Sequence, residues 1–332
     1  VIVTLSHLGY VKRMPLDTYK TQARGGRGII GSDTREGDFI EHLFTASTHD
    51  YLLVFTDRGK CYWLKVYNIP SMSRQSKGRN IINLLDLGKQ KISSIISVTN
   101  LEDTKKESDT RNLVMATRKG VIKKSSLADY SNPRTNGVIA IKIDDDDDLI
   151  GVALTYGDNE IVLGTRNGQA IRFSEEDVRC MGRVSRGVRG IKLKDNDQVM
   201  GMVIPSPESS LLTVCEKGFG KRTNLEDYRI QSRGGYGIIN IKTTDRNGKV
   251  VALKAVTDKD EIMMITAKGI IIRTGLDQLR EIGRNTQGVR LINLKDDDKL
   301  VASEKIAPEQ IEEELEAKEN SENQQNETGK EE

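Results

Sequence analysis

The sequence predicts an all-β protein built from six blades that are arranged radially in a disc. Three observations predict this fold class. One pattern of about 50 residues recurs six times along the chain. Each copy holds about four short apolar runs separated by turn residues, which is the strand content of one propeller blade. Each copy also carries two glycines at nearly constant separation, as a repeated hairpin and a repeated loop would require.

The first glycine of each copy lies between an apolar run and a basic segment. The six segments are TLSHLGYVKR, VFTDRGKCYWLK, MATRKGVIKK, LGTRNGQAIR, TVCEKGFGKR and MITAKGIIIR. Their glycines are Gly9, Gly59, Gly120, Gly168, Gly218 and Gly269. Because apolar runs flank each glycine, we expect a β-hairpin whose turn needs a residue that tolerates positive φ. The copies begin near residues 1, 50, 111, 159, 209 and 260, and residues 100–111 form a polar insertion.

The second glycine of each copy follows the first by 17 to 19 residues. These glycines are Gly28, Gly78, Gly137, Gly187, Gly237 and Gly288. An arginine stands four residues earlier in five copies, and in the third copy Arg134 is one step late. Short β-rich runs follow the second glycine. Acidic stretches such as IDDDDDLIGVAL predict further hairpins with polar turns, and the run Asp144–Asp148 is interpreted as such a turn rather than as a cation site.

Charge is distributed unevenly along the chain. Residues 309–332 contain ten glutamates and two lysines, a net charge of −8; since the whole chain carries +2, residues 1–308 carry +10. The acidic tail has few apolar residues and is predicted to be disordered. The sequence contains no apolar stretch long enough for a membrane helix, and its three cysteines never form a CxxC pair. We therefore expect a soluble cytoplasmic protein without metal or other cofactor, cut from a longer chain that precedes the strand-like VIVTL.

The stretch QARGGRGIIG contains Gly26, Gly28 and Gly31 in the GxGxxG spacing of dinucleotide-binding loops. A dinucleotide fingerprint needs a helix after the glycines, and IIGSDTREGD shows no helical period. The match is therefore interpreted as accidental. Paired glycines allow close backbone approach to a ligand, and the arginines at 24 and 27 suit the phosphates of a nucleic-acid backbone. A similar loop, QSRGGYG, recurs at 231–237 with Tyr236 in place of the second arginine.

The heptapeptide at 22–28 resembles the GyrA box, the motif Q-R/K-R-G-G-R/K-G found in the C-terminal domain of the A chain of DNA gyrase. Six positions match, and Ala23 replaces a basic residue. The resemblance extends over essentially the whole chain. It implies a six-bladed β-pinwheel, a propeller-like disc of four-stranded blades with a different strand connection, followed by the acidic tail. The related A chain of topoisomerase IV usually has a degraded box, so the heptad favours gyrase.

The resemblance also implies function and partners. Members of this family bind double-stranded DNA around the rim and wrap it, which presents a positive crossing so that ATP-driven strand passage introduces negative supercoils. The partners implied are the gyrase A breakage-reunion domain and gyrase B in an A2B2 holoenzyme. The catalytic tyrosine and the ATPase lie outside this chain, which is therefore expected to be a non-catalytic, monomeric part of a nucleoid-associated type II topoisomerase.

The candidate DNA-binding residues fall into two sets. The box comprises Gln22, Ala23, Arg24, Gly25, Gly26, Arg27 and Gly28. A basic belt is predicted because five of the six residues four places after the first glycine are basic; the exception is Trp63. With neighbouring and loop cations, the belt comprises Lys12, Arg13, Arg74, Lys77, Lys124, Arg134, Arg172, Arg183, Arg186, Arg222, Arg233, Arg273 and Arg284.

Two other classes of function are weighed against DNA binding. A propeller can serve as a platform for protein partners, in which case the basic periodicity would be incidental. An enzyme with a site in the central channel is disfavoured, because the sequence shows no set of nucleophile, base and orienting residue.

Overall fold

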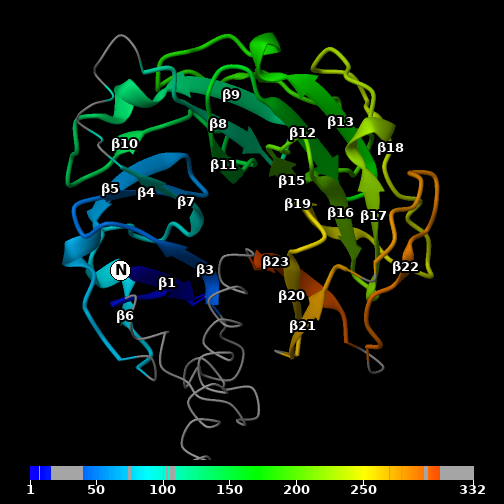
Figure 1. Cartoon of the computed structure of the whole chain (residues 1–332). Coiled ribbons are helices and arrows are strands. Elements are labelled where there is room, and N and C mark those ends of the chain that lie inside the picture. The colour runs from blue at the N-terminus through cyan, green and yellow to red at the C-terminus, as the bar shows by residue number, and fades with distance from the viewer. Residues whose placement is uncertain are drawn as a thin grey trace, which may run out of the picture.

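The computed structural model describes residues 1–6, 8–15, 40–73, 76–99, 101, 104, 109–268, 270–277, 279–294 and 298–306; within these, only the backbone is described at 40–45, 271, 304 and 306. In this part of the chain the strands form six small antiparallel sheets arranged around a common centre (Figure 1). The predicted all-β, six-bladed fold is confirmed. The acidic tail lies outside the described residues.

Each sheet is built on one central hairpin. The hairpins are β1 (Ile2–Ser6) with β2 (Tyr10–Met14), β4 (Tyr51–Thr56) with β5 (Lys60–Lys65), β8 (Asn112–Thr117) with β9 (Val121–Ser126), β12 (Glu160–Thr165) with β13 (Gln169–Ser174), β16 (Ser210–Cys215) with β17 (Phe219–Asn224), and β20 (Glu261–Thr266) with β21 (Ile271–Gly275). The five hairpin glycines that the structure describes adopt positive φ, as in Gly168 at 86°. A Cβ there would lie 2.2 Å from the carbonyl oxygen of Ile241, so the turn requires glycine.

An inner strand pairs with the first strand of each hairpin and faces the middle of the disc (Figure 1). The inner strands are β3 (Ile40–Thr45), β7 (Ile92–Val98), β11 (Leu149–Thr155), β15 (Val199–Val203), β19 (Val250–Val256) and β23 (Leu300–Ile306). All six carry a register shift against the hairpin strand. Such bulges increase local twist, which suits strands that converge on one axis.

The fourth strand of a sheet comes from the next unit of the chain. These peripheral strands are β6 (Arg79–Asn80), β10 (Val138–Ile139), β14 (Val188–Arg189), β18 (Ile238–Ile239) and β22 (Val289–Arg290). The β18 strand, for example, pairs with β13 of the preceding blade. In the described residues, units two to six therefore each contribute to two sheets, which is the strand connection of a pinwheel. Within the described residues, the sheet of β20, β21 and β23 has three strands.

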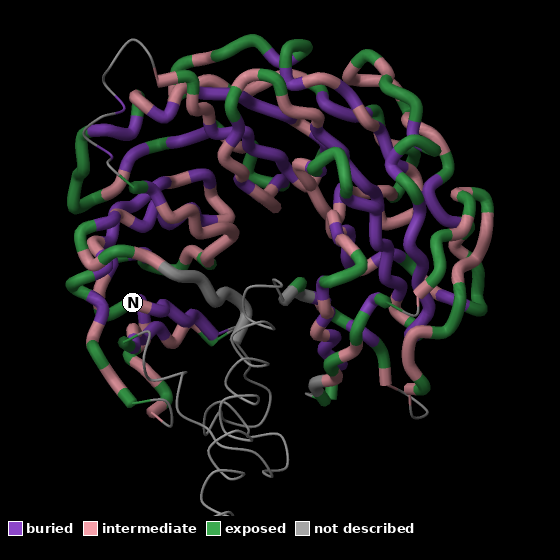
Figure 2. Tube along the Cα trace, in the orientation of Figure 1, coloured by how far each residue is buried: buried purple, intermediate pink, exposed green. Residues whose placement is uncertain are grey.

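The core lies between neighbouring blades (Figure 2). Successive residues of β4 point to opposite faces, so Leu53 and Phe55 pack with the third blade while Leu52 and Val54 pack with the first. The same alternation places Leu113 of β8 against the second blade and Val114 against the fourth. Strands covered on both faces are hydrophobic along their whole length, which explains the continuous apolar runs that mark the repeat in the sequence.

Single-turn 3-10 helices follow the second hairpin strand or the peripheral strand. They are η2 (Val66–Asn68), η3 (Ile81–Asn83), η5 (Leu127–Tyr130), η6 (Glu175–Asp177) and η7 (Leu225–Asp227). Side chains of Asn80, Ser126, Ser174 and Asn224 accept a backbone hydrogen bond two residues ahead and so fix the start of four of these turns. The turns hold backbone carbonyls in place beside the outer part of the preceding blade.

Candidate nucleic-acid interface

The heptapeptide at 22–28 and Arg74 lie outside the described residues, so their role stays a prediction. The related loop at 231–237 is described, and it shows how such a segment is built. The amide of Gln231 donates to the Arg172 carbonyl at 2.8 Å, and the amide of Gly234 donates to the Gly190 carbonyl at 2.6 Å. The loop of the fifth unit therefore lies over the outer parts of the third and fourth blades.

Arg233 and Gly237 anchor this loop to the neighbouring blades. The Arg233 guanidinium donates through Nε to the Asp177 carbonyl at 2.8 Å and through Nη1 to the Arg189 carbonyl at 3.1 Å. Gly237 has φ of 71°, and a Cβ there would lie 2.4 Å from the Ala170 carbonyl oxygen. The position requires glycine because the loop passes so close to the neighbouring backbone. Arg233 is half-buried, so the predicted phosphate contact competes with these carbonyls.

Position 284 repeats this arrangement in the sixth unit. The Arg284 guanidinium donates to the Ile239 carbonyl at 2.8 Å and lies 5.9 Å from the Tyr228 ring centroid. Arg183 of the fourth unit is also half-buried, and its carbonyl accepts a hydrogen bond from the Lys123 ammonium. The guanidinium groups of Arg233 and Arg284 thus anchor their loops to a neighbouring blade, whereas at Arg183 the backbone carbonyl makes the contact.

The belt position four residues after the first glycine is occupied by side chains that bind the next unit. Arg172 donates through Nη1 to the carbonyls of Leu225 at 2.7 Å and Tyr228 at 3.1 Å, at the two ends of η7. Its Nε donates to Glu160 at 2.7 Å. The guanidinium therefore closes one blade onto the turn that follows it, and we call this position the latch.

Arg222 is the most buried latch arginine, with 4% of its surface exposed. Its Nη1 donates to the Leu276 carbonyl at 2.9 Å, its Nε donates to the Ser210 hydroxyl at 3.0 Å, and Nη2 pairs with Asp258 at 2.6 Å. One buried side chain thus joins the Ser210 hydroxyl of its own blade to the Leu276 carbonyl of the next unit, and its removal would break both hydrogen bonds.

Two other latch residues use the same carbonyl positions. Lys124 is buried; its ammonium donates to the Glu175 carbonyl at 3.0 Å and lies 3.6 Å from the carboxylate of that residue, which is itself fully buried. Arg13 donates through Nε to the Ile69 carbonyl at 2.6 Å. In the sixth blade Arg273 is exposed and pairs with Glu261 of the same hairpin.

Trp63 is the latch of the second blade. Its indole Nε1–H donates to the Tyr130 carbonyl at 2.8 Å, the position that Arg172 reaches at Tyr228. The ring is nearly buried in the core shared by blades two and three. The one non-basic residue at this position of the repeat therefore keeps the donor and replaces the charge by apolar surface. Donation to a carbonyl of the next unit is the role that the latch residues of the first five blades share.

These contacts give part of the predicted belt a structural role. Arg13, Lys124, Arg172 and Arg222 bind the adjacent unit within the fold, and their contact with DNA stays a prediction. Lys12 is also buried and donates to the carbonyls of Ser73 and Ser76. The basic residues recur in the sequence because each contact between neighbouring units uses a donor at the same place. A recurring cation at this position is explained by that contact and does not by itself indicate DNA binding.

The positions equivalent to Lys12 in the third and fifth blades are Lys123 and Lys221. Both side chains are buried, and Lys221 donates to the carbonyls of Gly283 and Arg284 at 2.9 and 2.8 Å. Lys123 donates in the same way to Ala140 at 2.5 Å and to Arg183. Burial lowers the pKa of both ammonium groups to about 8, since loss of hydration disfavours the charged form.

Other predicted cations do lie exposed on the periphery. Lys77, Arg134 and Arg186 belong to the loops that precede the peripheral strands. Arg186 pairs with Asp144 at 2.8 Å but keeps 63% of its side chain exposed. These three residues come from different units, so the loops distribute positive charge around the disc.

Sequence reasoning missed a second recurring cation. Lys142, Lys192 and Lys242 each stand five residues after the second glycine of their unit, and all three are exposed. Their backbone amides donate to Ser185, Gly235 and Thr286, the loop residue two places before the glycine of the next unit. This regular bond fixes each lysine beside the following loop. We call these three lysines, with the exposed Arg189 and Arg290 of the peripheral strands, the rim cations.

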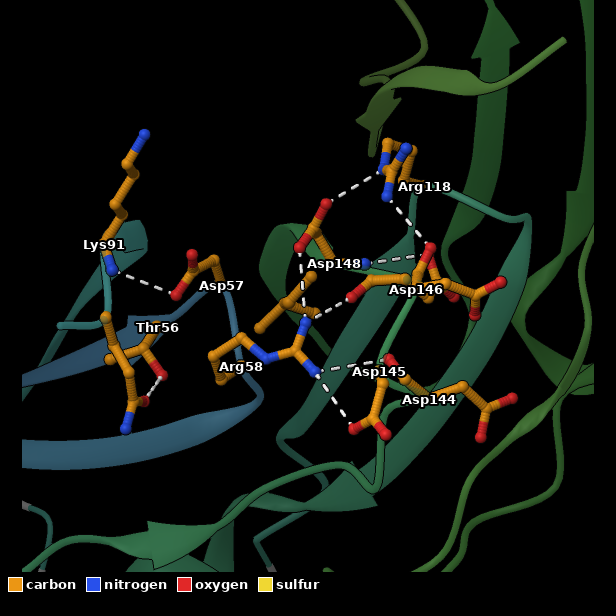
Figure 3. A network of polar contacts seen from close by, with 12 residues as sticks. Thr56, Asp57, Arg58, Lys91, Arg118, Asp144, Asp145, Asp146 and Asp148 are labelled. Atoms are coloured by element: carbon orange, nitrogen blue, oxygen red, sulfur yellow. Dashed lines mark hydrogen bonds and ion pairs between the residues drawn. The ribbon is translucent and has the colours of Figure 1, made fainter. Parts of the chain in front are cut away.

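The aspartate run connects two blades (Figure 3). The sequence predicts that it closes a hairpin, but β10 before it pairs with β5 and β11 after it pairs with β8, so the run crosses between sheets. Arg58 of the second blade donates to the Asp147 carbonyl at 2.7 Å, and Arg118 of the third pairs with Asp148 at 2.9 Å. The run is a polar turn, as predicted, bound by arginines.

Lys119 adds a further ion pair, with Asp146, whose pKa it lowers through a hydrogen bond and charge attraction. Among the described residues, no group of three histidine, cysteine, aspartate or glutamate side chains is arranged to hold a metal ion. No helix in the described ranges is long and apolar enough to cross a membrane.

Comparisons with known proteins agree with this architecture. A family model described as DNA gyrase C-terminal domain, beta-propeller, matches residues 1–47, 50–99, 111–155, 159–206, 209–257 and 260–306. The DNA gyrase A protein of Buchnera aphidicola subsp. Acyrthosiphon pisum is 55% identical over 313 residues, which are 94% of this chain and 37% of that protein. The DNA gyrase A protein of Salmonella typhimurium strain LT2 is 44% identical over 318 residues, 96% of this chain and 36% of that protein.

Two solved structures share the fold. A DNA gyrase A C-terminal domain superposes with a TM-score of 0.72 at 30% identity, covering 92% of this chain and 99% of that one. The C-terminal domain of a DNA topoisomerase IV gives a TM-score of 0.81 at 24% identity and 96% coverage of both chains. The chain spans little more than a third of the length of the two curated relatives.

Proposed function

Because the chain belongs to the family of DNA gyrase C-terminal β-propeller domains, we propose that it binds duplex DNA along the periphery of the disc and wraps it. The observation that carries this proposal is the regular placement of the rim cations. Each lysine of the set is fixed by the same backbone hydrogen bond to the next loop, so successive units present a cation in the same local geometry.

The energetics of wrapping require such a repeated contact. Bending 20 to 30 base pairs through 40 to 90° costs on the order of 1 to 6 kcal/mol, so a longer wrap must be offset by many phosphate contacts. Cations that recur unit by unit around a curved edge supply these contacts without selecting a base sequence. We therefore expect affinity to fall steeply between about 50 and 200 mM salt, and duplexes long enough to wrap to bind more tightly than short straight ones.

The heptapeptide at 22–28 is proposed to fix the path of the DNA. In the related loop at 231–237 the arginine anchors the loop while the side chain before the last glycine points into solvent as an exposed residue. By analogy Arg27 would contribute more to phosphate binding than Arg24, and the paired glycines would allow the close packing that the loop needs.

At the level of the whole enzyme, we propose that the wrap presents a positive DNA crossing to a gyrase core formed with the breakage-reunion domain and gyrase B. ATP-driven strand passage on this crossing would introduce negative supercoils. The chain itself would bind DNA and leave cleavage to the rest of the enzyme.

A topology assay tests the proposal. Relaxed circular plasmid is treated with topoisomerase I in the presence of the protein, and the change in linking number reports the sign and extent of wrapping. We expect the unchanged protein to alter the linking number, and a variant with alanine at Arg24, Gly25, Gly26 and Arg27 to lose this effect while it keeps its fold and much of its DNA affinity. An unchanged topoisomer distribution with the natural protein would contradict wrapping, and full wrapping by the variant would contradict the role of the box.

A further inference from the structure

Tyr236 occupies a position of the repeat that is cationic in three other units. It stands immediately before the second glycine, where the first, second and fourth units have Arg27, Lys77 and Arg186. Tyr236 as a residue is 48% exposed. A half-exposed tyrosine at a position where other units have a cation offers aromatic surface that a ligand can cover.

The ring is held in place by its surroundings. Lys192 of the preceding unit lies with its ammonium 4.7 Å from the ring centroid, within the range of a cation–π contact. The Lys192 amide also donates to the Gly235 carbonyl at 2.8 Å, next to the tyrosine in the chain. With Gly237 seated against the backbone of β13, the loop on both sides of Tyr236 is anchored. The ring is therefore presented in a defined orientation.

The neighbourhood combines apolar surface with positive charge. Ile239 on β18 is 39% exposed and follows Tyr236 by three residues. The exposed rim cation Lys192 lies over the ring, and the exposed Lys242 follows the loop in the same unit. A ligand that covers the ring must therefore also tolerate, and gain from, the adjacent Lys192 ammonium. This favours a polyanion that has apolar surface of its own, and duplex DNA offers both, in its phosphates and its deoxyribose rings.

We propose that Tyr236 makes a non-ionic contact with the sugar and groove surface of the wrapped duplex, with Lys192 as the residue that positions the ring. This inference rests on the proposed function. Phosphate contacts release counterions and so depend on salt, whereas an uncharged ring displaces no counterion. Tyr236 thus supplies affinity that persists at high salt, at a point of the periphery where other units use charge.

The experiment measures the equilibrium constant of the 1–332 chain for a duplex long enough to wrap, as a function of salt, by anisotropy or filter binding. We expect Tyr236→Ala to lower affinity about fivefold at every salt concentration, with the slope of log K against log salt unchanged. Tyr236→Phe keeps the ring and should bind nearly as the natural protein does. Tyr236→Arg should steepen the slope by about 0.9, since it adds one phosphate contact.

Lys192 is tested by rescue. Lys192→Ala removes both the cation and the support of the ring, so affinity should fall and the slope should decrease by about 0.9. Lys192→Arg keeps a cation over the ring and should restore both. A combination of Lys192→Ala with Tyr236→Ala should cost less than the sum of the two single changes if the lysine positions the ring.

Three outcomes would overturn the inference: an affinity of Tyr236→Ala equal to that of the natural protein, a decrease in its slope, or a loss of thermal stability that accounts for the weaker binding. Co-purification of a protein partner that Tyr236→Ala releases while DNA affinity is unchanged would assign the ring to that partner instead. If the natural protein shows no salt-dependent DNA binding at all, the proposed function fails, and the inference with it.

Discussion

The basic latch residues and the rim cations carry the same charge and recur with the same period, yet they have different roles. Arg222 is almost fully enclosed; it donates to the Leu276 carbonyl of the next unit and pairs with the Asp258 carboxylate. Lys142 and Lys242 are exposed, and their backbone amides bind the next unit. A charged residue that recurs in every unit of a repeat protein therefore indicates a contact that recurs in every unit. Where carbonyl groups enclose the side chain, that contact is made inside the protein and not with a ligand.

The largest effect is expected from removing a latch. Arg222→Ala removes an enclosed side chain together with its hydrogen bonds to the Leu276 carbonyl and the Ser210 hydroxyl and should lower the free energy of unfolding by about 3 kcal/mol. Denaturant or thermal unfolding of the variant measures this. The matched control is Arg189→Ala, an exposed rim cation, which should change stability by less than about 0.5 kcal/mol. Equal effects of the two substitutions would remove the distinction between latch and rim.

Removing rim cations should weaken DNA binding without lowering stability. Replacing Lys142, Lys192 and Lys242 together by glutamine should leave the unfolding transition nearly unchanged but reduce the slope of log K against log salt by about 2.7, because three phosphate contacts are lost. Affinity near 0.1 M salt should fall on the order of a hundredfold, equally for different DNA sequences. Salt titrations with two unrelated duplexes check both expectations. An unchanged slope would place the DNA elsewhere on the molecule.

A smaller effect tests the donor role of the latch without a charge. Trp63→Phe keeps an aromatic ring in the core but removes the N–H that donates to the Tyr130 carbonyl. We expect a loss of about 1 to 2 kcal/mol in the free energy of unfolding, the usual cost of leaving a buried carbonyl without a partner. DNA affinity per folded molecule should not change. A variant as stable as the natural protein would mean that the indole contributes packing alone.

The smallest effect concerns pH. The pKa of Lys221 is lowered to about 8 by burial, so the unfolded chain binds more protons than the folded one between pH 8 and the ordinary lysine range. Its contribution to stability therefore rises with pH in this window, by at most about 1.4 kcal/mol per pH unit. The stability difference between the natural protein and Lys221→Met should grow in favour of the natural protein from about pH 8 to about pH 9.5. A difference independent of pH would contradict the shift.

Much of the architecture could be predicted because the repeat is visible in the sequence. Glycines at positions such as 168 and 237 recur since a Cβ there would collide with a neighbouring backbone. These glycines can therefore be recognised from the sequence alone. The apolar runs predicted the strands for a similar reason: a strand covered on both faces is apolar at every position. The hairpin predicted at the aspartate run is wrong because polarity indicates a turn without indicating which strands it joins.

The sequence by itself determined the number of units, the strands of each hairpin and the places where the backbone turns through positive φ, since these depend on residues close together in the chain. Only the tertiary structure decided which cations are enclosed and which face water, and which sheet each peripheral strand completes. Whether an arginine meets a carbonyl or a phosphate depends on what the next unit places some 50 residues later, as Arg172 shows by reaching Leu225 and Tyr228. The local sequence does not distinguish the two roles, because an arginine that binds a carbonyl and one that binds a phosphate have the same side chain, charge and spacing.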